Sequence, residues 1–252
     1  MAKLPFSFTI EDLKDRIRIG FKLKEIDPEN RRLVLVGNEQ IMQDKDQLIL
    51  GKLDAEDEEI EAFIASPFYE RSLLQTHDRG IVLIDLADFS KLSNDLQVRL
   101  ITRFQFYIRH MVNLHQQQVE SVLSTGDGYF IIYREEGFSS MLRFVMKLIQ
   151  QLSFYNFEDV GITKFYFRIA INIGRVHFFF DINERWNYVG DGINDAKRII
   201  DFIPHEKENA VYLSANVYEL HKNESFSFGP LQIGLDKHKK EHQFVELFYQ
   251  RI

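Results

Sequence analysis

The chain has 252 residues, of which 45% are hydrophobic and 27% charged, and its formal net charge is −7. This composition is typical of a globular protein, and its acidity predicts that nucleic acid is not a partner, because the phosphate backbone attracts basic surfaces. The absence of cysteine excludes disulfides and cysteine nucleophiles, and the lack of a signal peptide or an apolar run of roughly 18 residues predicts a cytoplasmic protein without a membrane span.

Residues 1–75 are expected to form a small α/β extension. The pattern predicts a helix over 11–18 with Thr9 as its N-cap, strands over 21–26 and 32–36, and an acidic helix over 54–65. The carboxylates of that last helix are interpreted as a solvated face rather than a metal site.

From residue 76 onward, strands and helices alternate. The predicted elements are a strand over 81–84, a helix over 94–116 that begins with a capping box of Asn94 and Gln97, strands over 119–123 and 129–133, a helix over 138–152, strands over 164–173 and 176–180 around Gly174-Arg175, a helix over 193–202, a strand over 211–213, a short helix from Ala215, and a strand over 244–249. The order β-α-β-β-α-β predicts an α+β fold with a ferredoxin-like core.

Two aspartates stand at the ends of predicted strands. Asp85 follows the apolar run 81–84, and Asp127 lies in the turn 125–128. In this order of elements the strands can be neighbours, so the two carboxylates can meet and bind Mg²⁺, which prefers oxygen ligands. The alternative is that Asp85 caps a turn and Asp127 only shapes the hairpin.

A glycine-rich segment precedes the helix over 193–202. Gly190 and Gly192 permit an unusual backbone turn. Asn194 and Arg198 are four residues apart and share one helix face, and the guanidinium fork of arginine suits a phosphate. The alternative is an ordinary loop followed by a surface polar pair.

Four segments, in this order, resemble motifs of the class III adenylyl and guanylyl cyclase catalytic domain. They are Asp85–Ser90, Ser124–Gly128, Arg168–Gly174 and Gly190–Arg198. The resemblance covers about residues 78–250 and implies a catalytic domain over 76–252 with the cyclase type of ferredoxin-like core. Residues 1–75 lie outside it.

The resemblance also implies a reaction. A nucleoside triphosphate is cyclised to a 3′,5′-cyclic nucleotide, with pyrophosphate released, at sites shared between the two chains of a homodimer. The implied roles are two Mg²⁺ or Mn²⁺ ions at Asp85, Leu86 and Asp127; a phosphate loop of backbone N–H groups from Leu86 through Ala87, Asp88, Phe89 and Ser90; ribose orientation by Asn194; α-phosphate stabilisation by Arg198; and triphosphate binding by Lys237, with Lys239 as the other candidate.

The resemblance fails at the residues that select a purine. Leu123 stands where adenylyl cyclases carry lysine and guanylyl cyclases glutamate, while Asn187 aligns with the second base-binding residue. Asp88 replaces a glycine common in the first motif. Leu123 offers no hydrogen bond, whereas Asn187 offers a donor and an acceptor. In lacking the purine signature the chain is similar to the pyrimidine cyclases of bacterial antiphage defence, which favours UTP or CTP.

Two other interpretations stay open. One is an adenylyl cyclase with unconventional base-binding residues, and the other is a non-catalytic module that binds a nucleotide or only dimerises. A degenerate module is expected to lose at least one of the four site residues Asp85, Asp127, Asn194 and Arg198. All four are present, which favours catalysis.

Overall fold

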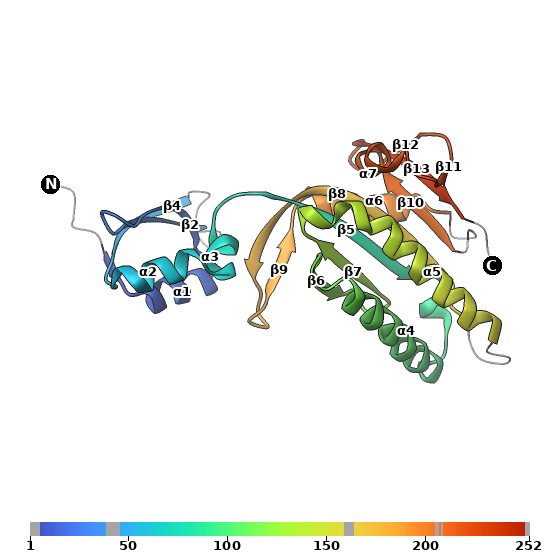
Figure 1. The fold of residues 1–252 in the computed structure, drawn as a ribbon, viewed down its shortest axis with the longest axis horizontal. Coiled ribbons are helices and arrows are strands. Elements are labelled where there is room, and N and C mark those ends of the chain that lie inside the picture. Colours follow the sequence, from blue (N-terminus) through green and yellow to red (C-terminus); the bar gives the residue numbers. More distant parts are fainter. Residues whose placement is uncertain (1–5, 39–45, 159–163, 205–206, 208, 250–252) are drawn as a thin grey trace. The chain divides into compact units, whose positions relative to one another are not determined.

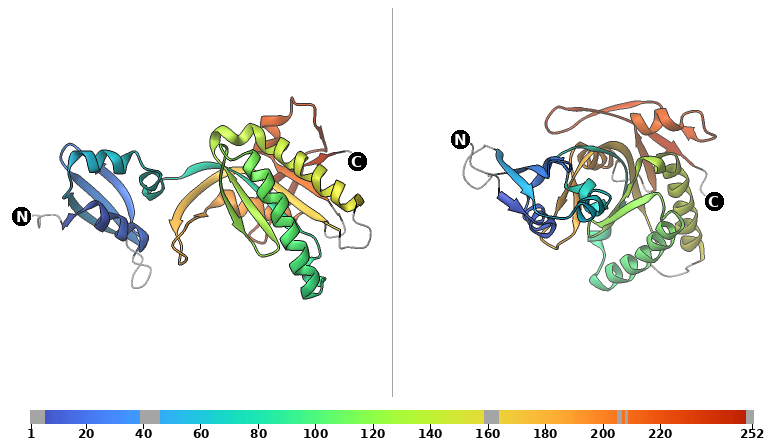
Figure 2. Two further views of the ribbon diagram at one scale, coloured as in Figure 1. Left: turned by 60° about the horizontal axis from the view of Figure 1, so that its bottom comes forward. Right: turned by 60° about the vertical axis from the view of Figure 1, so that its left-hand side comes forward.

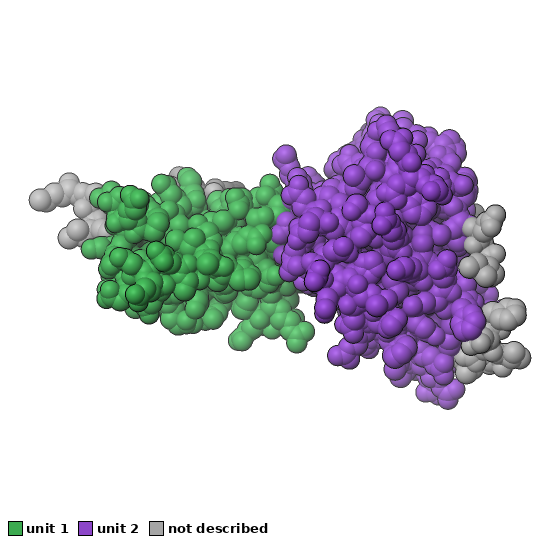
Figure 3. All heavy atoms as spheres, viewed as in Figure 1, with its two compact units in different colours: residues 1–77, 177–189 green, residues 78–176, 190–252 purple. Residues whose placement is uncertain are grey.

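The computed structural model describes residues 6–38, 46–158, 164–204, 207 and 209–249. They divide into two compact units (Figure 3). One contains the described residues up to His77 together with 177–189, and the other contains 78–176 and the described residues from Gly190 onward. The sequence-based division after residue 75 assigned 177–189 to the second region, whereas the structure groups this segment with the first. Within the described ranges, no helix has the length and apolar character needed to cross a bilayer.

The first unit is a small sheet covered by helices. Its elements are β1 (Phe6–Phe8), α1 (Ile10–Arg18), β2 (Lys22–Asp27), β3 (Arg32–Asn38), β4 (Asp46–Leu53), α2 (Asp57–Ile64) and α3 (Pro67–Ser72), and the strand order is β1-β4-β3-β2. Thr9 caps α1 as predicted, because its side chain accepts from Asp12 N while Asp12 accepts from Thr9 N. Leu13, Leu23, Leu35 and Ile60 contribute to its buried core.

The second unit contains the predicted β-α-β-β-α-β core (Figures 1 and 2). Its elements are β5 (His77–Leu86), a 3₁₀ turn (Phe89–Lys91), α4 (Asn94–Leu114), β6 (Val119–Ser124), β7 (Gly128–Tyr133), a 3₁₀ turn (Glu135–Ser140), α5 (Met141–Glu158), β8 (Phe167–Phe180), α6 (Asp191–Asp201), β10 (Ala210–Ser214), α7 (Ala215–His221), β11 (Ser227–Phe228), β12 (Gln232–Leu235) and β13 (Glu241–Phe248). The order β8-β5-β7-β6 is that of a ferredoxin-like sheet, and β10 extends it parallel to β8.

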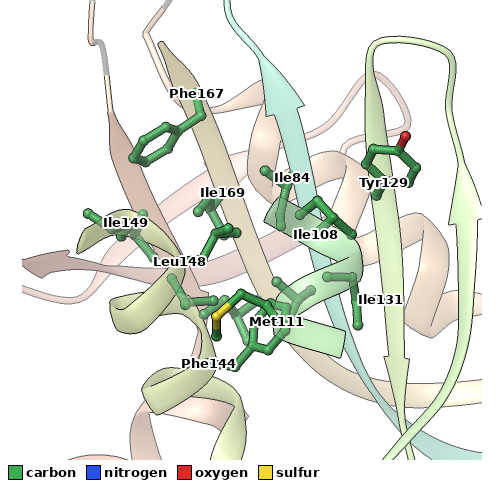
Figure 4. Packing of buried hydrophobic residues seen from close by; sticks show 14 of the residues in the cluster. Ile84, Ile108, Met111, Tyr129, Ile131, Phe144, Leu148, Ile149, Phe167 and Ile169 are labelled. Carbon is green, nitrogen blue, oxygen red and sulfur yellow. The ribbon is translucent and has the colours of Figure 1, made fainter. Parts of the chain in front are cut away.

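The helices α4 and α5 cover one face of this sheet. Strand side chains alternate between faces, and Ile84 lies in the cluster that also contains Ile108 of α4 and Leu148 of α5 (Figure 4). Val82 belongs to the same cluster. The alternate residue Ile81 faces α6 instead, because a Cβ on Gly192 would lie 3.0 Å from Ile81 Cδ1. Because α6 packs against the opposite face, Asp85, which shares the alternation of Ile81, lies on the same face as α6.

Two predicted local features are wrong. Strand β8 runs unbroken through Gly174-Arg175, because Gly174 serves close packing rather than a turn: a Cβ there would lie 2.8 Å from Gly192 Cα. The capping box is also absent, since the N-cap of α4 is Ser93. The side-chain amide of Gln97 instead donates to the carbonyl oxygens of Phe89 and Leu92, at 3.2 and 3.0 Å.

Candidate active site

Asp85 and Asp127 lie side by side where β5 ends and β7 begins. Asp85 is opposite Gly128 in the antiparallel ladder, and Leu86 N donates to Asp127 O at 3.2 Å. A Cβ on Gly128 would lie 2.0 Å from Ile84 O, so only glycine permits this close approach. The Asp-Gly turn therefore does more than close the hairpin, because it brings the second carboxylate to the first.

Arg168 adds a positive charge to this pair. It lies on β8, the other neighbour of β5, and its Nη2 donates to Asp85 Oδ2 in a largely buried ion pair. Burial is the largest influence on the pKa of Asp85 and raises it; Arg168 opposes that rise, and the charges of Asp127 and Asp201 add to it. The site thus gathers more carboxylates than guanidinium groups.

Oxygen donors with an excess of negative charge fit a hard divalent cation. In the part of the chain that the structure describes, no group of three or more His, Asp or Glu side chains is placed to hold a metal ion by itself. Asp85 and Asp127 could supply two of the oxygen ligands of such a cation.

The loop after Asp85 offers fewer backbone N–H groups to a phosphate than the sequence indicated. The backbone N–H of Leu86 donates to Asp127 O, and that of Ala87 donates to Tyr166 O at 2.8 Å, so neither is available to cradle a phosphate. The first N–H groups of the following 3₁₀ turn, which contains Phe89 and Ser90, have no carbonyl partner within that turn.

Asp88 adopts a backbone conformation that explains the glycine of the family motif. Its φ is 58°, in the left-handed region, which aspartate tolerates better than most residues that have a side chain. Its carboxylate is exposed and contacts Lys91 Nζ at 2.7 Å. The added negative charge is therefore turned to solvent and partly compensated.

Glycines fix the position of α6. Gly190 has φ of 136° and precedes the helix, and a Cβ on Gly192 would lie 2.8 Å from the backbone of Gly174. Asn172 Nδ2 donates to Gly192 O at 2.9 Å. With the helix held in this way, Asn194 is exposed and Arg198 is half-buried.

The side chain of Arg198 is held by a carboxylate that the sequence analysis missed. Arg198 Nε lies 3.4 Å from Asp236 Oδ2, and His242 Nε2 lies 3.4 Å from the same oxygen. Burial opposes ionisation of Asp236, but hydrogen bonds from Lys240 N and His238 N, with the contacts to His242 and Arg198, lower its pKa to about 2. These contacts favour the ionised form of the Asp236 carboxylate beside Arg198.

The lysines of this turn take different positions. Lys237 and Lys239 are exposed, and Lys239 has φ of 63°. Lys240, which the sequence analysis did not consider, contacts Asp195 of α6 at 3.1 Å through its Nζ atom. The three lysines thus present a cationic turn beside α6.

The two candidate base-binding residues belong to different units. Leu123 is half-buried on β6, opposite Phe130 of β7. Asn187 lies on β9 (Trp186–Val189) in the first unit. Its side-chain oxygen accepts from Tyr188 N at 2.8 Å, and its Nδ2 donates to Asp181 Oδ2 at 3.3 Å. The amide of Asn187 is thus oriented by its own hairpin.

Comparison with known proteins identifies the fold. No family model and no curated protein matches the sequence, but many solved structures match the chain. They include the catalytic core of a rhodopsin-guanylyl cyclase with converted specificity in complex with ATPαS (20% identity, TM-score 0.57, covering 70% of this chain and 98% of that one). The guanylate cyclase domain from Catenaria anguillulae in complex with GTP (19%, 0.57, 69% and 98%) and a bacterial light-regulated adenylyl cyclase (17%, 0.56, 69% and 91%) are similar too. The fold is that of adenylyl and guanylyl cyclase catalytic domains, as predicted.

Proposed function

We propose that this chain is a nucleotidyl cyclase whose second unit converts a nucleoside triphosphate to a 3′,5′-cyclic nucleotide and pyrophosphate. The observation that carries the proposal is the pairing of Asp85 with Gly128, which joins two carboxylates on a cyclase fold. On the same sheet face, α6 carries Asn194 and Arg198 four residues apart. This set of groups suits phosphoryl chemistry.

The reaction forms one P–O bond and breaks another. The ribose 3′-oxygen attacks the α-phosphorus, its proton passes to solvent water, and the bond from the α-phosphorus to the pyrophosphate oxygen breaks. Two divalent cations held by Asp85, Leu86 and Asp127 would supply Lewis-acid polarisation of the hydroxyl and phosphate oxygens. Asn194 orients the ribose, Arg198 donates to the α-phosphate as its charge develops, and Lys237 binds the triphosphate.

The complete site needs two copies of the chain. As the resemblance to class III cyclases implies, the carboxylates of one protomer would face Asn194 and Arg198 of its partner across a two-fold interface. Within one chain, Asp85 contacts Arg168, while Arg198 contacts Asp236 and, at a longer distance, Asp201. The side chains of Asp85 and Arg198 are thus each held by ion pairs within their own chain.

A pyrimidine is the proposed base. A half-buried leucine at position 123 cannot form the hydrogen bond that the resemblance assigns to this position in adenylyl and guanylyl cyclases, so the purine-selecting contact of those enzymes is missing. We therefore propose UTP or CTP, with cUMP or cCMP acting as a second messenger in antiphage signalling, the setting that the resemblance suggests.

The first test is to supply each nucleotide in turn. The purified protein is incubated separately with ATP, GTP, CTP and UTP, with Mn²⁺ and then Mg²⁺, and products are identified by mass spectrometry. We expect a single cyclic pyrimidine nucleotide that disappears in Asp85→Asn. Cyclic AMP would refute the proposed base but not the enzyme class, and binding without any product would support a non-catalytic module.

Asp236 is expected to act by positioning Arg198. Its replacement with asparagine removes the anion that lies 3.4 Å from Arg198 Nε, and we expect kcat to fall about 3- to 30-fold, the range for a weakened charge-assisted contact at a half-exposed side chain. Steady-state kinetics checks this, with the exposed Glu241→Gln on the adjoining strand as the control. Equal kinetics for the two variants would contradict a positioning role.

A further inference from the structure

The hairpin that carries Asn187 is built into the N-terminal unit. The last residues of β8 pair with β9, with Phe178 opposite Tyr188 and Phe180 opposite Trp186. This hairpin, residues 177–189, groups with the described residues up to His77 rather than with the rest of β8 (Figure 3). The extension therefore has a direct structural connection to one candidate base-binding residue.

An aromatic cluster makes this connection. The ring of Trp186 lies 5.2 Å from that of Phe68 in α3 and 5.4 Å from that of Phe180, and Trp186 packs against the core of the N-terminal unit. Phe178 is fully buried, and its ring lies 5.2 Å from that of Tyr188. Such ring pairs add to the stability gained by burial alone.

Lys22 links the hairpin 177–189 to the rest of the N-terminal unit with hydrogen bonds. From β2, its Nζ donates to Arg71 O at 3.1 Å and also to Phe178 O, and it lies 5.4 Å from the centre of the Trp186 ring. Burial lowers the pKa of Lys22 to about 8. A half-buried ammonium group is costly unless it is well paired, and here two carbonyls and an aromatic face supply the pairing.

Asn187 lies on the opposite face of this hairpin. Successive strand residues point to opposite sides, so Trp186 and Tyr188 face the N-terminal unit while Asn187 faces away, opposite Phe179 in the ladder. The side-chain contact with Asp181 and the contacts of Lys22 thus act on the two faces of one short β-ribbon. A shift of the face that carries Trp186 and Tyr188 must therefore move Asn187 as well.

We infer that the N-terminal extension positions the base-binding side of the hairpin, and that Lys22 and Trp186 are positioning residues for Asn187. This inference rests on the proposed function. It gives the extension a role in substrate affinity and base selection, and it predicts that anything that loosens the extension changes nucleotide binding before it changes the chemical step.

The test compares Lys22→Met with Lys24→Met in the full-length protein. Methionine keeps the apolar stem of Lys22 but removes its donors, and Lys24 is an exposed lysine of the same strand. We expect K22M to raise KM and the dissociation constant of the preferred triphosphate about 3- to 10-fold, the effect of losing one or two hydrogen bonds, with kcat within about twofold. The ratio of kcat/KM between the preferred triphosphate and the others should decrease in K22M. K24M should match the wild type.

The fluorescence of Trp186 can show, independently of activity, whether the packing of the hairpin 177–189 has changed. It is the only tryptophan in the chain, so its emission and its accessibility to acrylamide should change in K22M and not in K24M. Hydrogen exchange at residues 177–189 should become faster. Trp186→Phe, which keeps an aromatic ring, provides a second variant should K22M fold poorly, and we expect its KM to rise while kcat holds.

The possible outcomes separate the inference from the function on which it rests. If the wild type forms product and K22M equals K24M in KM and base preference, the inference is wrong and the cyclase proposal stands. If the wild type binds triphosphates without product and K22M weakens that binding, the inference holds for a binding module. If calorimetry detects no binding of ATP, GTP, CTP or UTP, both proposals are overturned.

Discussion

Asp85→Asn is expected to lower the rate of cyclic nucleotide formation at least about 10²–10³-fold, the scale set by removing one preorganised charge-stabilising group. Asparagine keeps the shape of the side chain and an oxygen that can accept from Arg168, so the largely buried guanidinium keeps a partner. What is lost is the negative charge that would hold a divalent cation. The variant should therefore fold normally and fail in catalysis.

Metal titration and a matched variant make this result specific. Activity is measured against increasing Mn²⁺, and the thermal unfolding midpoint is measured in parallel. Asp78→Asn serves as the control, because Asp78 is an exposed carboxylate on the same strand. If D85N keeps activity within tenfold of the wild type while D78N does too, Asp85 is not a metal ligand and the proposed site is wrong.

The elements that depend on local sequence were predicted well. The N-cap at Thr9 and the turn at Asp127-Gly128 follow from contacts within a few residues, and the structure contains both. The fold class followed from the order of these elements. Strand β8 was predicted to break at Gly174, because glycine within a strand often marks a turn. Its actual role, the approach of Gly192 from α6, depends on a distant segment.

The residues of the candidate site also separate into those that the local sequence pattern identified and those that it missed. Asp85 and Asp127 could be selected because each follows a recognisable strand or turn, and strand order then brought them together. Arg168 and Asp236 were missed as site residues, because their partners come from other elements of the fold. An arginine within the apolar strand 167–173 was an available signal, since a charged side chain there needs a buried partner.

The membership of the hairpin 177–189 could not be predicted from sequence. The pattern predicted a separate strand over 176–180 followed by a connecting segment, and nothing in the spacing of these residues points to the N-terminal unit. The contact is made by Trp186 and Lys22, which are 164 residues apart and become neighbours only through folding. A boundary drawn from the order of elements along the chain therefore separates residues that pack together.

The shared site can be tested by mixing two inactive variants. Asp85→Asn and Arg198→Ala should each be inactive alone. In a heterodimer of the two, one site carries both defects and the other carries none. After random exchange about half of the dimers are mixed and each has one intact site, so about a quarter of the wild-type activity should return.

A second mixture gives the sharpest control. Asp85→Asn combined with Asp127→Asn should not recover activity, because both residues lie on the same half of the site, and every site in such a heterodimer keeps one defect. Subunit exchange is confirmed by native mass spectrometry of differently tagged chains. Recovery in the first mixture and not in the second requires that Asp85 of one protomer act with Arg198 of its partner. No recovery in the first, despite proven exchange, would mean that each chain works alone or that the assignment of Arg198 is wrong.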